Sequence, residues 1–172
     1  MVKIVQQQDK ILRLKAKEVL VVKIKSPEIK KLLKAMSAAL AKEKDGVAIA
    51  APQIGVSYRL FVVSGRLMAK NPDQPEPDFI FINPKIISTS KKQVKMDEGC
   101  LSVRWLYGKV KRAEKATITA YNEQGKKITR HGSGLWAQIF QHEIDHLDGI
   151  LFIDKAEDLT ELKPKDIKEH VK

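Results

Sequence analysis

Two histidines and a glutamate late in the chain form a motif that can bind a metal ion. Residues 142–146 read His142-Glu143-Ile144-Asp145-His146, an H-E-x-x-H pattern. Because residues four apart on a helix share one face, with Cβ atoms about 5–6 Å apart, both imidazoles can reach a single ion. Glu143 points elsewhere, so the pattern places it as a general base beside the ion and not as a required ligand.

A third ligand can come from the single cysteine of the chain. Cys100 lies in the segment Glu98–Ser102 (EGCLS) and precedes His142 by 42 residues. One thiolate and two imidazoles leave a fourth tetrahedral position for water, as a catalytic site requires. Taken alone, a lone cysteine is more often a small buried hydrophobic residue, and H-E-x-x-H can be a solvated charged face. His131 and His170 lack such spacing, and we expect ordinary histidines there.

A helix must carry the histidine pair. We expect Ser133 as its N-cap and Gly149 as the residue that closes its C-terminus. One face carries four residues at the spacing i, i+4, i+7, i+11, namely Leu135, Ile139, His142 and His146. The metal-binding face therefore continues into an apolar stripe. This stripe either packs in the core or forms a pocket for a linear hydrophobic side chain.

The other segments predict an α+β fold. Ser26-Pro27-Glu28 begins a helix that reaches about Lys44, because it combines a capping residue, a proline at the first position and an acid in the first turn. Strands are expected over 47–50, 58–64, 78–83, 85–90, 115–121 and 126–130, with a loop over 71–77, a turn at Pro84 and a hairpin turn at 122–125. We expect a single domain over residues 1–172, with antiparallel or mixed strands around a central H-E-x-x-H helix.

Composition restricts the expected setting of the protein. The chain has 172 residues, and no apolar run approaches the roughly 18 residues of a membrane-spanning helix, so no membrane partner is expected. The first residues lack the apolar segment of a secretory signal. A single cysteine forms no internal disulfide, and a thiolate ligand is safest in a reducing compartment. A cytoplasmic location is therefore expected.

The formal net charge of +11 is unevenly distributed. Residues 1–45 carry 12 basic and 5 acidic groups, residues 91–130 carry 11 and 4, and residues 131–172 carry 5 and 9. A lysine-rich surface can attract an RNA-bearing partner through its phosphates. Aromatic residues are 6% of the chain, and no motif with base-stacking aromatics is visible, so DNA is not an expected partner.

Three motifs in this chain resemble those of the peptide deformylase family, over nearly its whole length. They are residues 46–53 (GVAIAAPQ), residues 98–102 (EGCLS) and residues 141–146 (QHEIDH). Each is a moderate or weak signal alone, whereas all three in the right order are highly specific. The resemblance implies removal of the formyl group from the N-terminal formyl-methionine of nascent polypeptides, with release of formate.

The resemblance also implies a role for each motif residue. Three of them would hold one divalent metal ion: Cys100, His142 and His146. Fe²⁺ is implied as the physiological ion, and Zn²⁺ or Ni²⁺ is possible in the purified protein. Glu143 would take the proton of the attacking water and deliver it to the departing amine. The Gln53 amide and the Leu101 backbone N–H would donate to the formyl oxygen as negative charge develops there.

A substrate groove follows from the same resemblance. The short strand 47–50 could pair with the substrate backbone as an added β-strand, which would allow many different nascent chains to bind. The substrate-binding residues would be Val47, Ala48, Gly99, Leu135 and Ile139. Of these, Val47, Leu135 and Ile139 would line the methionine pocket beside His142.

Two positions depart from the family pattern. The family usually has a second glycine where Ala48 stands, and the added methyl group is expected to crowd the approach of the substrate backbone. After Ser102 the family usually continues Val-Pro-Gly, whereas this chain reads Val103-Arg104-Trp105. Trp105 is expected either to reshape the rim of the site or merely to pack.

Two other functions remain open from the sequence. A zinc peptidase of the H-E-x-x-H type would take its third ligand downstream, for example from Glu157, Glu161 or His170. Metal that is retained after Cys100→Ala would favour that function. A non-enzymatic RNA-associated protein would use its lysines and keep the H-E-x-x-H segment as structure. Absence of bound metal would favour this second function.

Ribosome association is also possible. Bacterial members of the family can dock on the ribosome through a basic C-terminal helix, but residues 151–172 here carry 5 basic and 6 acidic groups. Such a tail has little net attraction for RNA. Any association is therefore expected to run through the basic segments 1–45 and 91–130.

Overall fold

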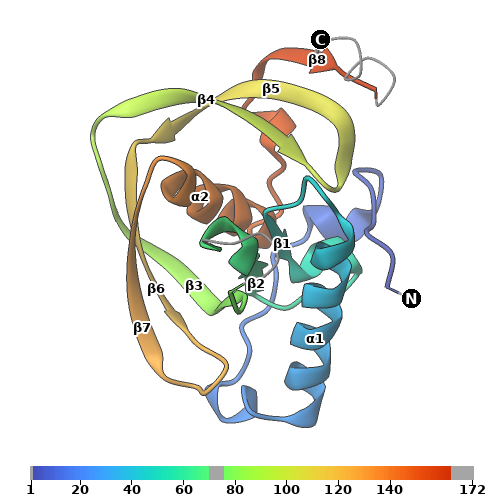
Figure 1. Cartoon of the computed structure of the whole chain (residues 1–172), viewed down its shortest axis with the longest axis vertical. Coiled ribbons are helices and arrows are strands. Elements are labelled where there is room, and N and C mark those ends of the chain that lie inside the picture. Colours follow the sequence, from blue (N-terminus) through green and yellow to red (C-terminus); the bar gives the residue numbers. More distant parts are fainter. Residues whose placement is uncertain (1, 70–75, 164–172) are drawn as a thin grey trace.

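The computed structural model of the protein describes residues 2–69 and 76–163. The strands form two sheets in which every pair of neighbours is antiparallel, and helix α2 (Leu135–Leu147) lies between them (Figure 1). This arrangement confirms the predicted α+β class with strands around a central H-E-x-x-H helix. The predicted loop over 71–77 lies mostly outside the described residues.

The larger sheet has the order β1-β2-β3-β6-β7 and the smaller one β4-β5-β8. The strands are β1 (Ala48–Ala50), β2 (Leu60–Val63), β3 (Phe79–Thr89), β4 (Gln93–Cys100), β5 (Val103–Ala113), β6 (Lys115–Tyr121), β7 (Lys127–Ser133) and β8 (Glu157–Glu161). Short 3₁₀ helices occur at Lys10–Arg13, Val21–Lys23, Ala51–Ile54, Gly65–Leu67 and Phe152–Asp154. Within the described ranges, no helix is both long and apolar enough to cross a membrane.

Helix α1 (Pro27–Lys42) begins as the sequence predicts and ends two residues earlier than expected. The Ser26 hydroxyl accepts a hydrogen bond from the Ile29 backbone N–H at 3.3 Å, which satisfies one of the free donors of the first turn. Its buried face belongs to a core cluster with residues of β1 and β2, such as Ile49 and Leu60. This packing holds the end of α1 close to the segment that leads into β1.

The expected turn at Pro84 is wrong, because β3 continues through this residue. The pairing of β3 with β6 is irregular between Ile82 and Lys85, and Asn83 has a positive φ of 51°. A proline is tolerated within a strand where the ladder is interrupted, because its missing N–H is then not needed. The Asn83 side chain bonds the backbone N–H and carbonyl of Val19, at 2.8 and 2.7 Å, which holds this irregular residue in place.

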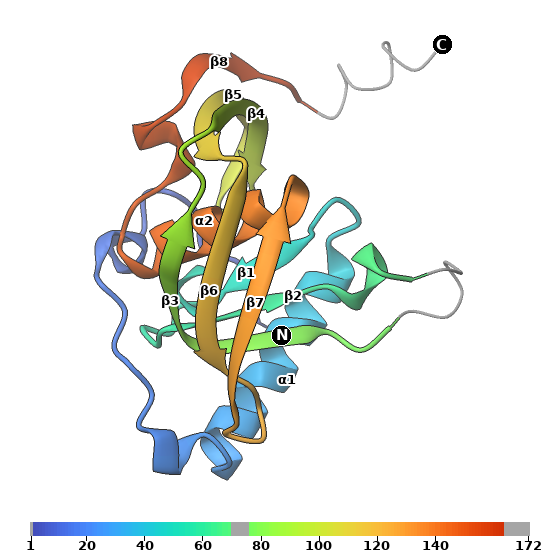
Figure 2. The same ribbon diagram turned by 90° about the vertical axis from the view of Figure 1, so that its left-hand side faces the viewer.

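Helix α2 is the central element of the fold. It lies behind strands β3, β6 and β7 in Figure 2. Its apolar residues share a core cluster with Phe61 and Phe81 of the larger sheet. The predicted N-cap Ser133 is wrong, since Ser133 is the last residue of β7 and pairs with Lys115. The N-cap is Gly134, whose φ of 54° and ψ of −125° suit glycine. At the other end Gly149 has φ 77°, as expected for a residue that closes a helix.

Candidate active site and metal centre

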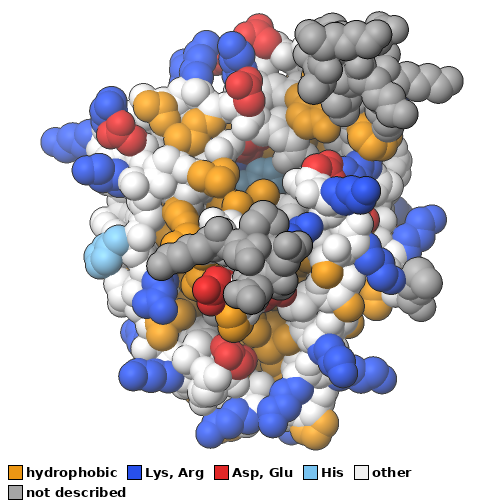
Figure 3. Space-filling model, in the orientation of Figure 1, with side chains coloured by type: hydrophobic (Ala, Val, Ile, Leu, Met, Phe, Trp, Pro, Cys, Tyr) orange, Lys and Arg blue, Asp and Glu red, His pale blue; other side chains and the backbone are white. Residues whose placement is uncertain are grey.

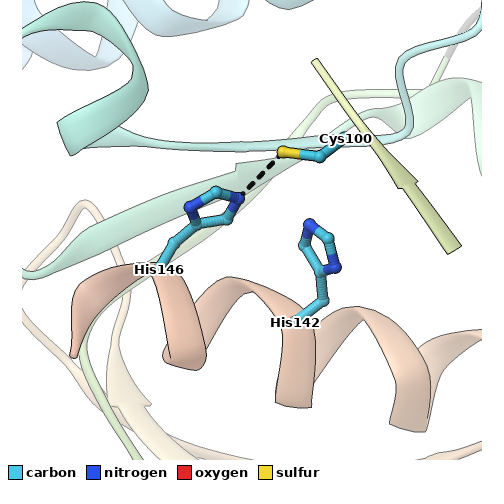
Figure 4. A group of neighbouring side chains, drawn as sticks. All are labelled: Cys100, His142 and His146. Atoms are coloured by element: carbon cyan, nitrogen blue, oxygen red, sulfur yellow. Dashed lines mark hydrogen bonds between the residues drawn. The ribbon is translucent and has the colours of Figure 1, made fainter. Parts of the chain in front are cut away.

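The side chains of Cys100, His142 and His146 point toward one another (Figure 4). One potential ligand atom from each lies within 4.8 Å of the others. The Cys100 Sγ is 3.1 Å from the His146 Nε2, and the two imidazole rings are 5.0 Å apart between centroids. The histidines come from successive turns of α2 and the cysteine from the end of β4. The fold thus brings the three predicted ligands together.

The remaining bonds of His142 orient it for metal binding. Its Nδ1 lies 2.9 Å from Glu98 Oε2, so an Nδ1–H donor to this carboxylate leaves the Nε2 lone pair free for an ion. The Arg112 guanidinium binds the two Glu98 oxygens at 2.7 and 2.9 Å and Asp145 Oδ2 at 2.5 Å. Burial raises the pKa of Glu98, but these bonds outweigh it and lower the pKa to about 2. Glu98 is therefore an ionised anchor for the imidazole.

The surroundings of Cys100 favour its thiolate. Burial raises the pKa of the thiol, but the His146 and His142 imidazoles outweigh burial and lower the pKa to about 5. The thiolate is the form that binds metal, and one sulfur with two imidazole nitrogens suits Zn²⁺ or Fe²⁺. The residues present therefore fit a divalent metal ion.

Glu143 lies beside the ligand group and does not belong to it. Its carboxyl group is buried and lines the same cavity, and within the described chain its Oε2 has no hydrogen-bond partner. Burial raises the pKa of this carboxyl group, against the opposing effect of the two imidazoles. A buried carboxylate with an unused oxygen can accept a proton from a water in the cavity.

Gln53 presents its amide N–H groups to the ligand group. The side chain is 2% exposed, and its Oε1 accepts a hydrogen bond from the Ala50 N–H at 2.8 Å. Its Nε2 is 3.1 Å from Ser102 Oγ and 3.5 Å from Cys100 Sγ. Because the amide oxygen is already bonded to the backbone, the amide nitrogen faces the site.

A cavity of about 260 Å³ adjoins these residues. Its walls include the predicted site residues Val47, Ala48, Gln53, Gly99, Cys100, Leu101, Leu135, Ile139, His142 and Glu143. His146 is not in the wall, and its side chain is buried beneath the site. The space-filling view shows a hollow with a histidine side chain at its floor and hydrophobic side chains around it (Figure 3). The cavity can thus take an apolar side chain beside the metal ligands.

The edge of the larger sheet borders this cavity. Within residues 2–69 and 76–163, strand β1 pairs with β2 alone, and the other side of its backbone has no neighbouring strand. The Val47 carbonyl accepts a hydrogen bond from the Ser64 N–H, so it points toward β2. Because backbone N–H and C=O groups alternate in direction along a strand, the N–H and C=O of Ala48 point the opposite way, toward the cavity. An extended peptide can pair with this edge.

The Ala48 side chain packs in the core, whereas the backbone of this residue faces the cavity. It is 6% exposed and belongs to the core cluster that includes Phe61 and Phe140. The methyl group that distinguishes alanine from the usual glycine therefore contributes to packing. Ala48 also lines the cavity, so an effect of this methyl group on the approach of the substrate backbone stays a prediction.

Several residues of the cavity wall did not stand out from the sequence. They are Asp45, Asp97, Leu106, Tyr107 and Gln138, whereas Arg104 and Trp105 of the wall belong to the segment that departs from the family pattern. Gly99 gives one signal: a Cβ atom there would lie 2.7 Å from the Tyr107 ring, so any other residue would force this ring of the cavity wall to shift. Trp105 lines the rim with a φ of 69°, a conformation that favours glycine, at the position where the family usually has one.

The two downstream candidates that the structure describes do not lie with the histidine pair. Glu157 pairs with Lys95 at 2.6 Å on the exposed surface of β8, and Glu161 is exposed at the end of the same strand. His170 lies outside the described residues. His131 is exposed beside Thr117, with 3.0 Å between Nδ1 and Oγ1. Among the described residues, the group that could hold a metal is Cys100, His142 and His146.

Comparisons with known proteins find relatives over most of the chain. The sequence profile of the polypeptide deformylase family matches residues 1–162. Peptide deformylase 2 of Clostridium acetobutylicum is 44% identical over 147 residues, which cover 86% of this chain and 89% of that protein. The peptide deformylase of Desulforudis audaxviator is 42% identical over 153 residues, 89% of this chain and 92% of that protein.

Solved structures show the same fold. The class I type b peptide deformylase of Acinetobacter baumannii with bound Met-Ala-Ser has a TM-score of 0.81 and 34% identity, over 90% of this chain and 98% of that one. The peptide deformylase of Thermotoga maritima has a TM-score of 0.80 and 31% identity, over 91% of this chain and 98% of that one. This chain therefore belongs to the polypeptide deformylase family.

Proposed function

We propose that the cavity above α2 is the active site in which this metal-dependent deformylase removes the formyl group of N-formyl-methionyl peptides. The reaction is that of the family, and the individual roles below are proposed. The observation that carries them is the convergence of Cys100, His142 and His146 beside Glu143, whose buried carboxylate has an unused oxygen. The test is release of equal amounts of formate and free-amine peptide from formyl-Met-Ala-Ser. Metal-loaded protein that releases neither would contradict the proposal.

The proposed metal ligands are Cys100, His142 and His146. A divalent ion there would lower the pKa of a coordinated water to about 7 and polarise the formyl carbonyl. We propose Fe²⁺ as the physiological ion, with Zn²⁺ or Ni²⁺ possible after purification in air. Elemental analysis of protein purified without oxygen tests this choice, and a stoichiometric content of another metal would contradict it.

Glu143 and two N–H donors would carry the chemical steps. Glu143 would accept the proton of the attacking water as its oxygen bonds to the formyl carbon. The Gln53 amide and the Leu101 N–H would donate to the formyl oxygen, which gains negative charge. When the C–N bond breaks, Glu143 would return the proton to the amine, leaving formate and the new N-terminus. Support for these roles comes from the position of all three residues in the cavity wall.

The substrate would bind as an added strand on the edge of β1. Val47 and Ala48 would contact its backbone, with Gly99 on the opposite wall. The methionine side chain would lie against Leu135 and Ile139. Leu135 is 48% exposed, so its burial by a ligand would remove apolar surface from water.

Loss of the Gln53 amide is expected to slow the chemical step. In Gln53→Ala, kcat should fall about 100-fold to 1,000-fold, the usual effect of removing one oxyanion donor. Metal content should change little, because Gln53 is not proposed as a ligand. Steady-state kinetics with formyl-Met-Ala-Ser and metal analysis of the same sample measure both. A kcat near that of the unaltered protein would remove Gln53 from the mechanism.

We also propose that the protein works in the cytoplasm and meets nascent chains near the ribosome. Support comes from the thiolate ligand, which needs a reducing setting, and from basic segments such as α1, where Lys30, Lys31 and Lys34 are exposed. Any contact with ribosomal RNA should weaken steeply with salt.

Charge reversal on α1 tests the ribosome contact. Changing Lys30, Lys31 and Lys34 to glutamate should reduce co-sedimentation with ribosomes at low salt, because the phosphates then face like charge. Removal of residues 164–172 should have little effect, and it retains the bond from Leu162 N–H to the Trp105 carbonyl. Loss of co-sedimentation only in the shortened protein would place the contact in the tail. No binding by the intact protein would mean that it meets nascent chains by diffusion.

A further inference from the structure

Arg104 joins two segments of the chain that both contribute residues to the cavity wall. Its Nη1 is 2.7 Å from Asp45 Oδ2, and its Nη2 also bonds Glu43 Oε2. Glu43 and Asp45 lie between α1 and β1, whereas Arg104 lies near the start of β5. The Arg104 side chain is 22% exposed, and both Arg104 and Asp45 line the cavity. The Arg104–Glu43 pair, with side chains 22% and 32% exposed, is less exposed than most surface ion pairs among the described residues, whereas the Asp45 side chain is 55% exposed.

Each of these segments adjoins a proposed part of the active site. Asp45 is two residues before Val47, and Arg104 is three residues after Leu101. Other arginine and glutamine side chains fix each segment separately. Arg66 Nη2 donates to the Glu43 and Gly46 carbonyls at 3.0 Å, and Gln6 Nε2 donates to the Leu101 carbonyl at 3.1 Å. The Arg104 side chain connects one segment to the other.

A bound peptide must pass this connection after its methionine. Gln53 and Cys100 mark the end of the groove where the formyl group would lie. A strand that runs antiparallel along β1 from that end proceeds from Ala50 toward Val47 and then Asp45. The residues that follow the methionine therefore reach the level of the Arg104 pairs.

The guanidinium of Arg104 is already occupied. Two of its nitrogens bond the carboxylates of Glu43 and Asp45, and its planar group lies 5.4 Å from the centroid of the Trp105 ring. Two of its five N–H donors are used by these carboxylates, which fix the orientation of the guanidinium plane. A peptide that binds Arg104 directly must compete with both carboxylates, so the geometry suits a role in holding the groove.

We propose that Arg104 is a positioning residue, whose pairs with Glu43 and Asp45 set the width of the groove where the peptide leaves the methionine pocket. This inference rests on the proposed function of the cavity. It assigns a role to a position where the family usually has proline. Since the pairs act on the peptide beyond the formyl group, they should influence KM for longer substrates and leave kcat and the metal unchanged.

The test uses two sets of changes that remove the same pairs from opposite sides. Arg104→Gln removes the cation, and the double change Glu43→Gln with Asp45→Asn removes both carboxylates at nearly constant shape. Each should raise KM for formyl-Met-Ala-Ser about fivefold, the upper end of what partly exposed ion pairs contribute. The triple variant should be no worse than Arg104→Gln alone, because the three changes break one set of bonds.

Further measurements separate positioning from general loss of structure. With formyl-Met amide, which lacks the following residues, KM should change less than twofold, and metal content should stay constant in all variants. Arg104→Lys should recover part of the loss, since an ammonium group can still pair with one carboxylate. Arg13→Gln is the matched control. It breaks an arginine–carboxylate pair with Asp154, whose members do not line the cavity, and should leave KM unchanged.

Two results would overturn the inference. The first is an unchanged KM for formyl-Met-Ala-Ser in Arg104→Gln. The second is a raised KM in Arg104→Gln together with an unchanged or lower KM in the Glu43→Gln, Asp45→Asn variant, which would mean that Arg104 binds the peptide directly. If Arg104→Gln does not fold, the Glu43→Gln, Asp45→Asn variant provides the test, and an unchanged KM for formyl-Met-Ala-Ser in that variant would overturn the inference. Failure of the unaltered protein to release formate would instead overturn the proposed function.

Discussion

Replacement of Glu143 by glutamine is expected to reduce turnover at least about 1,000-fold while the metal stays bound. General acid–base catalysis typically contributes 10²-fold to 10⁴-fold, and Glu143 is proposed to move the proton twice in each cycle. Glutamine has nearly the same shape but cannot accept that proton. Because Glu143 lies beside the ligand group and not in it, the metal should remain.

The measurement pairs single-turnover kinetics with metal analysis on the same sample. Circular dichroism and thermal unfolding provide the control for folding, since Glu143 is buried and its replacement leaves an amide in the core. Appreciable activity in Glu143→Gln would assign the proton transfer to another group. Loss of the metal in Glu143→Gln would mean that Glu143 binds the metal or holds one of its ligands in place.

Replacement of Cys100 by alanine is expected to remove both metal and activity. The alanine variant lacks the sulfur donor and leaves two imidazoles, which hold a divalent ion far more weakly than a thiolate with two imidazoles. Glu98, Arg112 and His142 remain bonded to one another, so the fold should be retained. Full metal occupancy in Cys100→Ala would contradict the ligand assignment and favour a zinc site with another third ligand.

The parts of the fold that the sequence predicted well are set by local chemistry. The Ser26 cap, the glycine at position 149 and the spacing of His142 and His146 act within one or two helical turns, so their consequences can be worked out without the rest of the chain. The three motifs could likewise be recognised because each is a short run of adjacent residues. Their assembly around one cavity depends on the sheets, but their identity does not.

The parts that were missed depend on tertiary structure. Strands β4 and β5 form a long hairpin, but the alternation in β4 has only two apolar residues, Val94 and Met96, before it ends in Asp97-Glu98-Gly99, and the one buried residue of the strand is the charged Glu98. The bulge that accommodates Pro84 depends on the distant backbone of Val19. In the same way, the pairs that Arg104 makes with Glu43 and Asp45 span 61 and 59 residues, and local sequence patterns cannot predict them.

The central claim is that one thiolate and two imidazoles bind the metal of this enzyme, and X-ray absorption at the metal edge of zinc-loaded protein tests it most directly. For the unaltered protein we expect one sulfur neighbour at about 2.3 Å and two imidazole nitrogens at about 2.0–2.1 Å. The Glu143→Gln protein should give the same neighbours. A spectrum of the unaltered protein without sulfur, or with only one imidazole, would contradict the assignment of Cys100, His142 and His146.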